Sequence, residues 1–347
     1  SYFGRLNYSF DDRYLASFTF RSDKSSLFSP ETRRGYFPSG ALSWRISNED
    51  FFNSAVFSDL KLRASYGILG LAGLGRYQYT GFLNQGTRAI FGLNQVEFTG
   101  GTQARLVPGN LKWERKATAN IGLDAGFFNN TLTATVDVFR SKTTDVLVEQ
   151  PLPGYLGNLG GNPVVNIGTI ENKGIEVELG YRPRNTGDFM WNVSANVSVI
   201  RNKILELGNL GVDPATGKSR DYIQSGNTRS QVGRSIGEYY VLRTDGIFQS
   251  QAEIDRHEAQ AAYAKPGDIR YLNLVDGGTD DDITDLDRDF AGSPWPKLTT
   301  GFQANLAYKD FSLNIQLYGA FGHKLYNDVI RQVDALEYSN YRRGLDY

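Results

Sequence analysis

The sequence contains no cysteine, which excludes disulfide frameworks, thiolate metal sites and cysteine nucleophiles together. Its two histidines, His257 and His323, are too few and too isolated for a zinc site or a catalytic triad. No run of about 18 apolar residues exists, so no transmembrane helix is available, and no signal peptide opens the chain. The formal net charge is −1, which gives no electrostatic reason to expect nucleic-acid binding.

Aromatic residues and glycine are abundant by contrast. The 347 residues include 20 Tyr, 21 Phe and 38 Gly but one Met. Such a content with few helix-type repeats is typical of an all-β protein. The length suits two or three soluble domains or one large closed sheet.

The segment from Ala117 to Thr143 shows the pattern that the rest of the chain repeats. Two long runs alternate apolar and polar residues on either side of Asn129-Asn130, for which we expect a two-residue turn. Period-two alternation indicates a strand with one apolar and one polar face. Both arms exceed the ordinary strand length of about 5–6 residues and suit the roughly 9–11 residues of a tilted membrane-crossing strand.

The same alternation predicts eight further strands. They cover Tyr2–Phe10, Tyr14–Arg21, Tyr36–Ile46, Leu60–Ile68, Lys173–Arg182, Trp191–Arg201, Leu298–Tyr308 and Phe311–Tyr318. The stretches between them are expected to be loops, with long ones around 70–109, 144–172 and 202–297.

The connections alternate in length along the chain, which places short turns at one end of an up-and-down sheet and long loops at the other. Aromatic residues lie beside every short turn: Phe10, Tyr14, Phe51, Phe52, Phe57, Phe127, Phe128, Tyr181, Trp191, Tyr308 and Phe311. Rings at the headgroup level form the aromatic girdle of an outer-membrane barrel. The alternative reading, that aromatic residues simply favour strands, predicts scatter instead.

The predicted fold is therefore all-β, a transmembrane antiparallel up-and-down β-barrel with its polar faces toward a wet or plugged lumen. The chain starts almost directly in a strand and ends without a terminating pattern, so we expect a fragment. Ten strands can close alone, yet these ends favour part of a wider barrel, such as the plugged transporters of about 22 strands. The long loops are expected outside the cell.

An ordered series of motifs resembles the SusC/RagA-type TonB-dependent outer-membrane transporters. It comprises the opening SYFGRLNYSFDDRYLASFTF, LKLRASYG, LKWE before NIGLDAGFFNN, TTDVL, ENKGIEVEL, NKILEL, GEYYVLRTDGIFQSQAEID and PGDIRY. The series runs nearly from end to end and is specific as a set. No plug domain, TonB-contacting box or final strands are present, and the resemblance implies that the parent protein has them.

The resemblance also implies partners and a function. It implies an outer-membrane location in a Gram-negative, Bacteroidota-like cell, and TonB-dependent import of glycans or peptides. A SusD-like surface lipoprotein would lid the barrel, and the TonB complex would act through the missing N-terminal part. The loop 202–297 would lie at the outer face, where the lipoprotein docks, and its length exceeds what a connection needs.

An acidic stretch in that loop is the candidate metal site. Asp276, Asp280, Ile283 and Asp287 fit positions 1, 5, 8 and 12 of a twelve-residue calcium loop. Gly278 and Asp281 do not fit positions 3 and 6, so a solvated acidic loop remains an equal alternative. Asp276, Asp280 and Asp287 are the expected ligands if calcium binds.

Other candidate sites are weaker. Gly70 to Gly75 resembles a phosphate loop without the required strand–helix unit. Glu176 and Glu178 lie two apart on one strand, and a polar lumen face explains them better than glycoside hydrolysis does. Loop aromatics are candidates for sugar stacking or for packing of the loops: Tyr77, Tyr79, Phe82, Tyr155 and Tyr222. No catalytic residue is predicted.

Three functions remain open from the residues. Energised import comes first, a passive porin-like channel second, and a secreted glycan-binding or glycan-cleaving β protein third. A plug domain upstream distinguishes the first from the second, and detergent dependence distinguishes both from the third.

Overall fold

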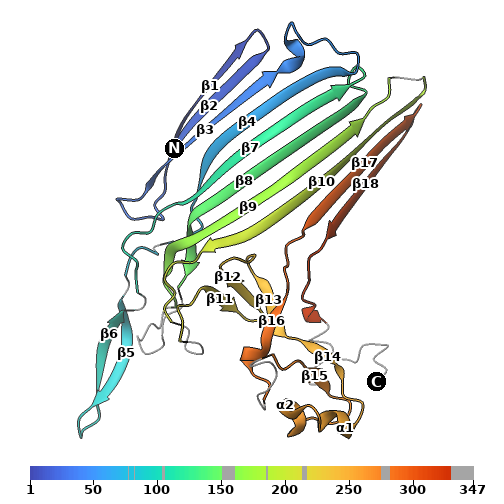
Figure 1. Cartoon of the computed structure of the whole chain (residues 1–347). Coiled ribbons are helices and arrows are strands. Elements are labelled where there is room, and N and C mark those ends of the chain that lie inside the picture. Colours follow the sequence, from blue (N-terminus) through green and yellow to red (C-terminus); the bar gives the residue numbers. More distant parts are fainter. Residues whose placement is uncertain are drawn as a thin grey trace. The chain divides into compact units, whose positions relative to one another are not determined.

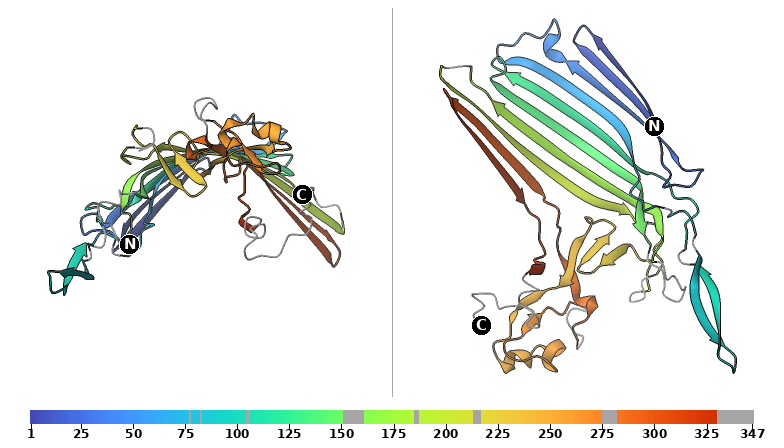
Figure 2. Two further views of the ribbon diagram at one scale, coloured as in Figure 1. Left: turned by 90° about the horizontal axis from the view of Figure 1, so that it is seen from below. Right: turned by 180° about the vertical axis from the view of Figure 1, so that it is seen from behind.

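Ten strands lie side by side in one sheet in the computed structural model (Figure 1). They are β1 (Tyr2–Phe10), β2 (Tyr14–Lys24), β3 (Arg34–Arg45), β4 (Phe57–Leu71), β7 (Glu114–Phe127), β8 (Leu132–Glu149), β9 (Val164–Tyr181), β10 (Phe189–Glu206), β17 (Leu298–Tyr308) and β18 (Phe311–Phe321). Neighbours pair antiparallel, and β1 and β18 form the two edges. Seen from below, the sheet bends into an open arc (Figure 2).

The structure describes residues 1–76, 78–81, 83–103, 106–150, 161–184, 187–212, 217–274 and 282–329. The chain divides into two compact units. The first comprises Ser1–Ser225, Arg229–Ile236 and Leu298–Gly319 and contains the sheet. The second comprises Gly226–Thr228, Gly237–Lys297 and the segment from Ala320 onward.

The connections leave alternately from the two edges of the sheet, and the three longest share one edge as the sequence predicts, although the connection 46–56 has 11 residues and the connection 25–33 has 9. Short connections at 11–13, 46–56, 128–131, 182–188 and 309–310 lie along the upper edge in Figure 1. Connections at 25–33, 72–113, 150–163 and 207–297 leave from the opposite edge. The short connection 46–56 includes the 3-10 helix η1 (Ile46–Asn48). We call these edges the short-turn edge and the long-connection edge.

Several strands are longer than the alternation predicts. Both β8 and β9 have 18 residues, so most of the expected loop 144–172 belongs to them, and that expectation is wrong. The ladder shifts register between Thr143 and Val146, and Asp145 has φ of 58°. A bulge of this kind resets the period of two, because one extra residue moves the following side chains to the other face. The pairing continues where the sequence pattern breaks.

The turn between β7 and β8 also differs from the expected two residues. The last register pair is Phe127 with Leu132, so four residues connect the strands. Phe128, Asn129 and Asn130 all have positive φ, between 51° and 60°. Asparagine tolerates this left-handed region better than most residues, and the Asn130 N–H donates to the Ser58 hydroxyl at 2.9 Å. That bond ties the turn to the neighbouring strand β4.

The stretch expected to be irregular before residue 110 contains a second hairpin. β4 runs to Leu71, and β5 (Leu83–Phe91) pairs with β6 (Val96–Gln103). These strands are rich in Gly, Thr and Gln, so they lack the alternation of apolar residues on which the prediction depended. Phe91 and Phe98 pack edge to face across the hairpin at 5.9 Å.

The longest connection is folded into short elements. They are β11 (Tyr222–Ser225), β12 (Thr228–Gln231), β13 (Glu238–Leu242), β14 (Thr244–Ile247), α1 (Gln251–Ile254), α2 (Glu258–Ala261), β15 (Ile269–Tyr271), the 3-10 helix η4 (Asp285–Asp287) and β16 (Arg288–Gly292). β13 pairs with β16, and β14 with β15. Phe248, Ile254 and Ala259 of the second unit are buried, and the Phe248 ring packs against the His257 ring. Among the described residues, no helix has the length and apolar character needed to cross a bilayer.

Buried apolar side chains of the first unit gather toward the long-connection edge. Phe28 and Phe37 pack against Trp113, with ring centroids 5.1 and 5.4 Å away. The Phe37 ring occupies the space that a Cβ on Gly35 or Gly70 would need, 2.3 and 2.0 Å from it. A second cluster contains Ile204, Leu207 and Leu210.

One face of the sheet carries large apolar side chains that no part of the described chain covers. Leu123, Val136, Val177 and Val197 form a continuous row across β7 to β10. Leu123 and Val136 are 38% and 37% exposed, and Val197 and Ile315 are 40% and 38% exposed. We call this the outer face, and the polar face behind it the inner face. An apolar surface of this extent is stable in water only when something covers it.

We expect arginine at Val136 to destabilise the folded barrel by about 2–4 kcal/mol, because it places a charge at the middle of the apolar face. Arginine at the neighbouring Thr135 should cost much less, since that side chain lies on the inner face and its hydroxyl contacts Asp124 at 3.3 Å. Unfolding by urea from lipid bilayers measures both variants. Equal destabilisation would contradict the assignment of faces.

The partly exposed Glu49 side chain holds the first two short connections together. The Tyr14 hydroxyl and the Trp44 indole N–H donate to the same Glu49 carboxylate oxygen, at 2.6 and 2.8 Å. The Arg13 guanidinium lies 3.3 Å from the other oxygen. These donors, the Tyr14 hydroxyl first, lower the pKa of Glu49 below its ordinary value. Two rim aromatics are thereby fixed in orientation by one charge.

The Glu49 carboxylate should therefore stabilise the protein above its unfolded pKa of about 4.3, and this contribution should be lost as the pH falls through the lower folded pKa. Glu49→Gln should unfold at lower urea concentration than the wild type at neutral pH. The difference should shrink as the pH falls below the unfolded pKa and should vanish once the pH is below the lower folded pKa, where the Glu49 carboxyl is neutral in both states. A difference that stayed constant over this range would show that the charge of Glu49 contributes nothing.

Candidate functional site

The inner face of the sheet is the candidate functional surface. Along each strand it presents Ser, Thr, Asn, Gln and Gly at alternate positions, as Thr118, Thr135, Ser194, Asn196 and Gln316 illustrate. Neutral hydroxyl and amide groups offer both donors and acceptors to water or to a polar solute. This composition suits a hydrated interior rather than a packed core.

Four charged side chains form a network on the inner face of β4, β7 and β8. Arg63 binds Asp124 through two nitrogens, both at 2.8 Å, and reaches Asp137 at 3.0 Å. Lys61 adds a further contact to Asp124 at 3.0 Å. Bidentate guanidinium–carboxylate pairs are among the stronger and more directional ion pairs. Two positive charges and two negative charges are thus balanced within the face.

Gly122 makes room for this network. A Cβ at Gly122 would lie 2.4 Å from an Asp137 oxygen and 2.7 Å from a nitrogen of Arg63. Any side chain there would push the ion pairs apart. The glycine therefore acts through the space that it leaves and not through its backbone conformation.

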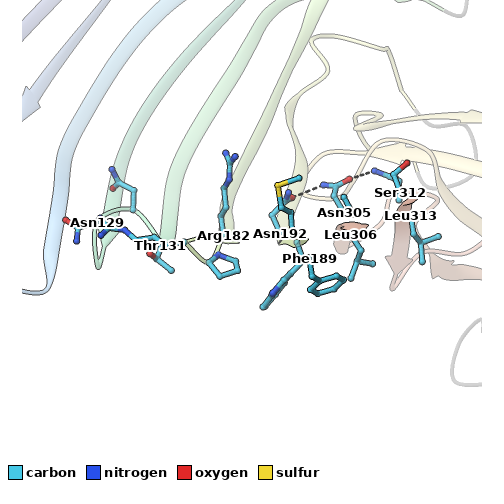
Figure 3. A pocket seen from close by; sticks show the side chains of 16 residues that line it. Asn129, Thr131, Arg182, Phe189, Asn192, Asn305, Leu306, Ser312 and Leu313 are labelled. Atoms are coloured by element: carbon cyan, nitrogen blue, oxygen red, sulfur yellow. Dashed lines mark hydrogen bonds between the residues drawn. The ribbon is translucent and has the colours of Figure 1, made fainter. Parts of the chain in front are cut away.

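Asparagine side chains connect the inner faces of β10, β17 and β18. The Asn305 amide donates to Asn192 at 2.8 Å, and the Asn314 amide donates in turn to Asn305 (Figure 3). These residues belong to a pocket of about 740 Å³ at the short-turn edge, whose other lining residues include Asn129, Thr131 and Arg182 (Figure 3). The pocket offers hydrogen-bonding groups from several strands to whatever occupies the barrel at this edge.

Four of the aromatic side chains predicted at the short-turn edge form two ring pairs there. Phe57 and Phe127 have centroids 4.8 Å apart, and Tyr181 and Trp191 are 5.2 Å apart. Paired rings across neighbouring strands stabilise a sheet and provide amphipathic groups at its rim.

The structure describes only one of the three predicted calcium ligands. Asp276 and Asp280 lie outside the described residues, whereas Asp287 is fully buried. One Asp287 oxygen accepts the Leu274 N–H at 2.7 Å, and the other accepts the Thr284 N–H at 2.7 Å. Asp287 thereby connects the two ends of the acidic stretch. Calcium binding here stays a prediction.

The weaker candidates are placed without a catalytic geometry. Glu176 accepts a hydrogen bond from Ser198 at 3.1 Å on the inner face. His257 lies 2.9 Å from the Tyr271 carbonyl oxygen through Nε2. The Arg229 guanidinium covers the Tyr222 ring at 3.9 Å, and Tyr79 contacts Arg33 at 3.4 Å. Tyr77, Phe82 and Tyr155 lie outside the described residues.

Sequence reasoning missed the charged network, although a signal for it was present. In the hairpin register Asp124 faces Thr135 and Asp137 faces Gly122, so the two aspartates are diagonal neighbours on the inner face, close to the turn. Two carboxylates at that distance on an inner face need cations from a neighbouring strand, and Lys61 and Arg63 are the charged residues of β4 at that height. Only the strand order was needed in addition.

Comparison with known proteins supports the fold and identifies the family. Residues 1–228 match the family model described as TonB dependent receptor-like, beta-barrel. The chain is 35% identical over 328 residues to TonB-dependent receptor P26 of Formosa agariphila, covering 94% of this chain and 32% of that protein. It is 32% identical to TonB-dependent receptor SusC of Bacteroides thetaiotaomicron, covering 95% of this chain and 32% of that protein.

A solved structure has the same fold. The RagAB peptide transporter superposes with a TM-score of 0.73 at 24% identity, over 92% of this chain and 33% of that one. The chain thus spans about a third of the length of these relatives. The expected resemblance to SusC/RagA-type receptors and the expected all-β barrel fold are confirmed. The chain belongs to the TonB-dependent receptor β-barrel family.

Proposed function

We propose that this chain forms part of the barrel of an outer-membrane receptor that imports a nutrient by a TonB-dependent mechanism. The observation that carries the proposal is the two-faced sheet: an uncovered apolar outer face and a polar inner face that carries the paired charges of Lys61, Arg63, Asp124 and Asp137. Such a sheet forms a passage for polar solutes when it closes in a bilayer. Membership of the receptor family supports energised import over passive diffusion.

We propose further that the receptor acts with a SusD-like surface lipoprotein and takes up glycans or peptides. The similarity to SusC supports the partner, and the similarity to the RagAB peptide transporter supports peptides as one class of cargo. The long-connection edge would face outward, because it carries the folded connection 207–297 and the hairpin β5–β6. Long extracellular loops and short periplasmic turns are the usual arrangement in such barrels.

The outward position of the connection 207–297 and its role in lipoprotein docking are testable by replacing part of it, in a way that the strand register permits. Leu242 and Arg288 are register partners at the end of β13 and the start of β16, so a short epitope can replace residues 243–287 as a hairpin loop. In the full receptor we expect normal barrel insertion and an epitope accessible to antibody on intact cells. Lipoprotein association and cargo uptake should be lost.

The same epitope inserted between Asn129 and Asn130 is the matched control. It lies at the short-turn edge and should be undetectable on intact cells, but detectable after permeabilisation. If antibody detects the epitope at this turn on intact cells but does not detect it in the replaced connection, the orientation is the reverse of the proposed one. Co-purification of the lipoprotein at normal yield with the replacement variant would show that residues 243–287 are not its docking site.

The predicted calcium site is testable without disturbing Asp287, whose carboxylate has a local structural role. If calcium binds the acidic stretch, chelation should increase proteolytic cleavage within the connection 207–297 of the full receptor. The double variant Asp276→Asn, Asp280→Asn should be cleaved at the faster rate with or without chelator. Cleavage of the wild type that chelator leaves unchanged would support a solvated acidic loop instead.

A further inference from the structure

Three basic residues stand side by side on the outer face near the long-connection edge. Arg140 of β8 is the register partner of Lys173 of β9, and Lys173 is the partner of Arg201 of β10. All three side chains are exposed. They follow directly after Val138, Ile175 and Val199, the last members of the apolar band on these strands. The face changes from apolar to cationic within one register step.

The next outward row adds two more cations and one carboxylate. Lys142 and Lys203 are both register partners of Glu171. The Glu171 side chain is buried, and its Oε2 contacts Arg140 Nε and Nη2 at 2.6 and 2.5 Å. We call the five cations Arg140, Lys142, Lys173, Arg201 and Lys203 the basic patch.

The basic patch carries more positive charge than the protein neutralises. Like charges directly opposite each other on neighbouring strands destabilise a sheet. Glu171 is committed to Arg140, and no other carboxylate in the described part of the chain lies within ion-pair distance of Lys173 or Arg201. An anion from outside the protein would therefore reduce the repulsion among Arg140, Lys173 and Arg201.

A hollow beside the patch indicates what kind of anion. It has a volume of about 530 Å³, and its apolar walls come from Ala119, Ile121, Val138, Ile175 and Val199. Arg140, Lys173 and Arg201 line the same hollow at its end. An amphipathic molecule with a hydrocarbon chain and an anionic head matches this surface, whereas a small free anion uses only the cationic end.

The height of the patch suits a lipid headgroup. Arg140 follows Leu132 by eight residues on β8, about 26 Å along the strand at roughly 3.3 Å per residue. A tilt of about 40° reduces this to roughly 20 Å of height, close to the far boundary of an apolar band about 25 Å tall. Long cationic side chains extend the remaining distance toward the headgroups.

We propose that the basic patch binds the phosphorylated headgroup of a glycolipid in the outer leaflet, with an acyl chain of that lipid in the adjacent hollow. The inference goes beyond nutrient import, and it rests on the proposed function only for the membrane location and the outward orientation of the long-connection edge. Lysine and arginine supply charge-assisted hydrogen bonds to phosphate oxygens. Bound lipid would neutralise the row and hold β8, β9 and β10 together.

The test uses the full receptor in nonionic detergent, with binding of bisphosphorylated lipid A measured by native mass spectrometry. Phosphate-free lipid A is the comparison lipid. We expect the wild type to prefer the phosphorylated form, and Lys173→Gln with Arg201→Gln to bind it about 30-fold more weakly. This pair leaves the Arg140–Glu171 ion pair intact, so the buried carboxylate keeps its partner.

Two variants serve as controls. Arg184→Gln with Lys309→Gln removes two positive charges at the short-turn edge and should bind as the wild type does. Lys173→Arg with Arg201→Lys keeps the charge and should retain binding. Heat-modifiable electrophoretic mobility confirms that each barrel is folded.

Equal binding by the wild type and the Lys173→Gln, Arg201→Gln variant would overturn the proposal, as would equal affinity for both lipids. Displacement of lipid A by millimolar inorganic phosphate would overturn it in favour of a site for free anions. Cargo uptake by the same variant is measured separately. If the wild-type receptor binds lipid A but imports no cargo, the result would count against the proposed function and not against the lipid site.

Discussion

Backbone hydrogen bonding between neighbouring strands is the interaction on which the rest of the structure depends. In hydrocarbon each unpaired N–H or C=O costs several kcal/mol, so a spanning strand needs partners on both sides. Eight of the ten sheet strands have them, and β1 and β18 have one neighbour each. The pairing fixes the period of two, and the period of two assigns every side chain to the outer or the inner face.

That assignment divides the electrostatics of the sheet. On the inner face Arg63, Asp124 and Asp137 are paired within the protein, over the space left by Gly122. At the short-turn edge the Glu49 carboxylate accepts hydrogen bonds from Tyr14 and Trp44 and so fixes the orientation of two aromatic side chains. In both places a charge that is partly removed from water is surrounded by its own donors. The same hydrogen bonds therefore stabilise the charge of each carboxylate and fix the orientation of the side chains that donate to it.

Alternation alone predicted the ten sheet strands and their faces, because that pattern is a direct consequence of the pleat. It failed where the backbone departs from the pleat. The bulge at Asp145 ended the pattern while the ladder continued, and the left-handed Phe128, Asn129 and Asn130 made a wider turn than Asn129-Asn130 suggested. The hairpin β5–β6 gave no signal, since its strands lack a regular alternation of apolar residues.

Candidate sites were less predictable because they depend on contacts between distant segments. The hairpin register already places Asp124 near Asp137, yet the cation comes from β4, some 60 residues earlier, as the Arg63 contact to Asp124 shows. For Asp287 the acidic spacing suggested a metal ligand, whereas the contacts show a carboxylate that accepts N–H groups from Leu274 and Thr284. The same residue type at the same spacing serves either purpose.

The two faces differ finally in where their charges find counter-charges. Inner-face cations meet carboxylates of adjacent strands, as Lys61 and Arg63 do. Among the outer-face cations beyond the apolar band, Arg140 holds the carboxylate of Glu171, and Lys173 lies directly between Arg140 and Arg201. In the inner-face network of Lys61, Arg63, Asp124 and Asp137, the four charges balance within the protein. A surface that faces lipid headgroups has fixed anions beside it, and the protein can leave its cations unpaired there.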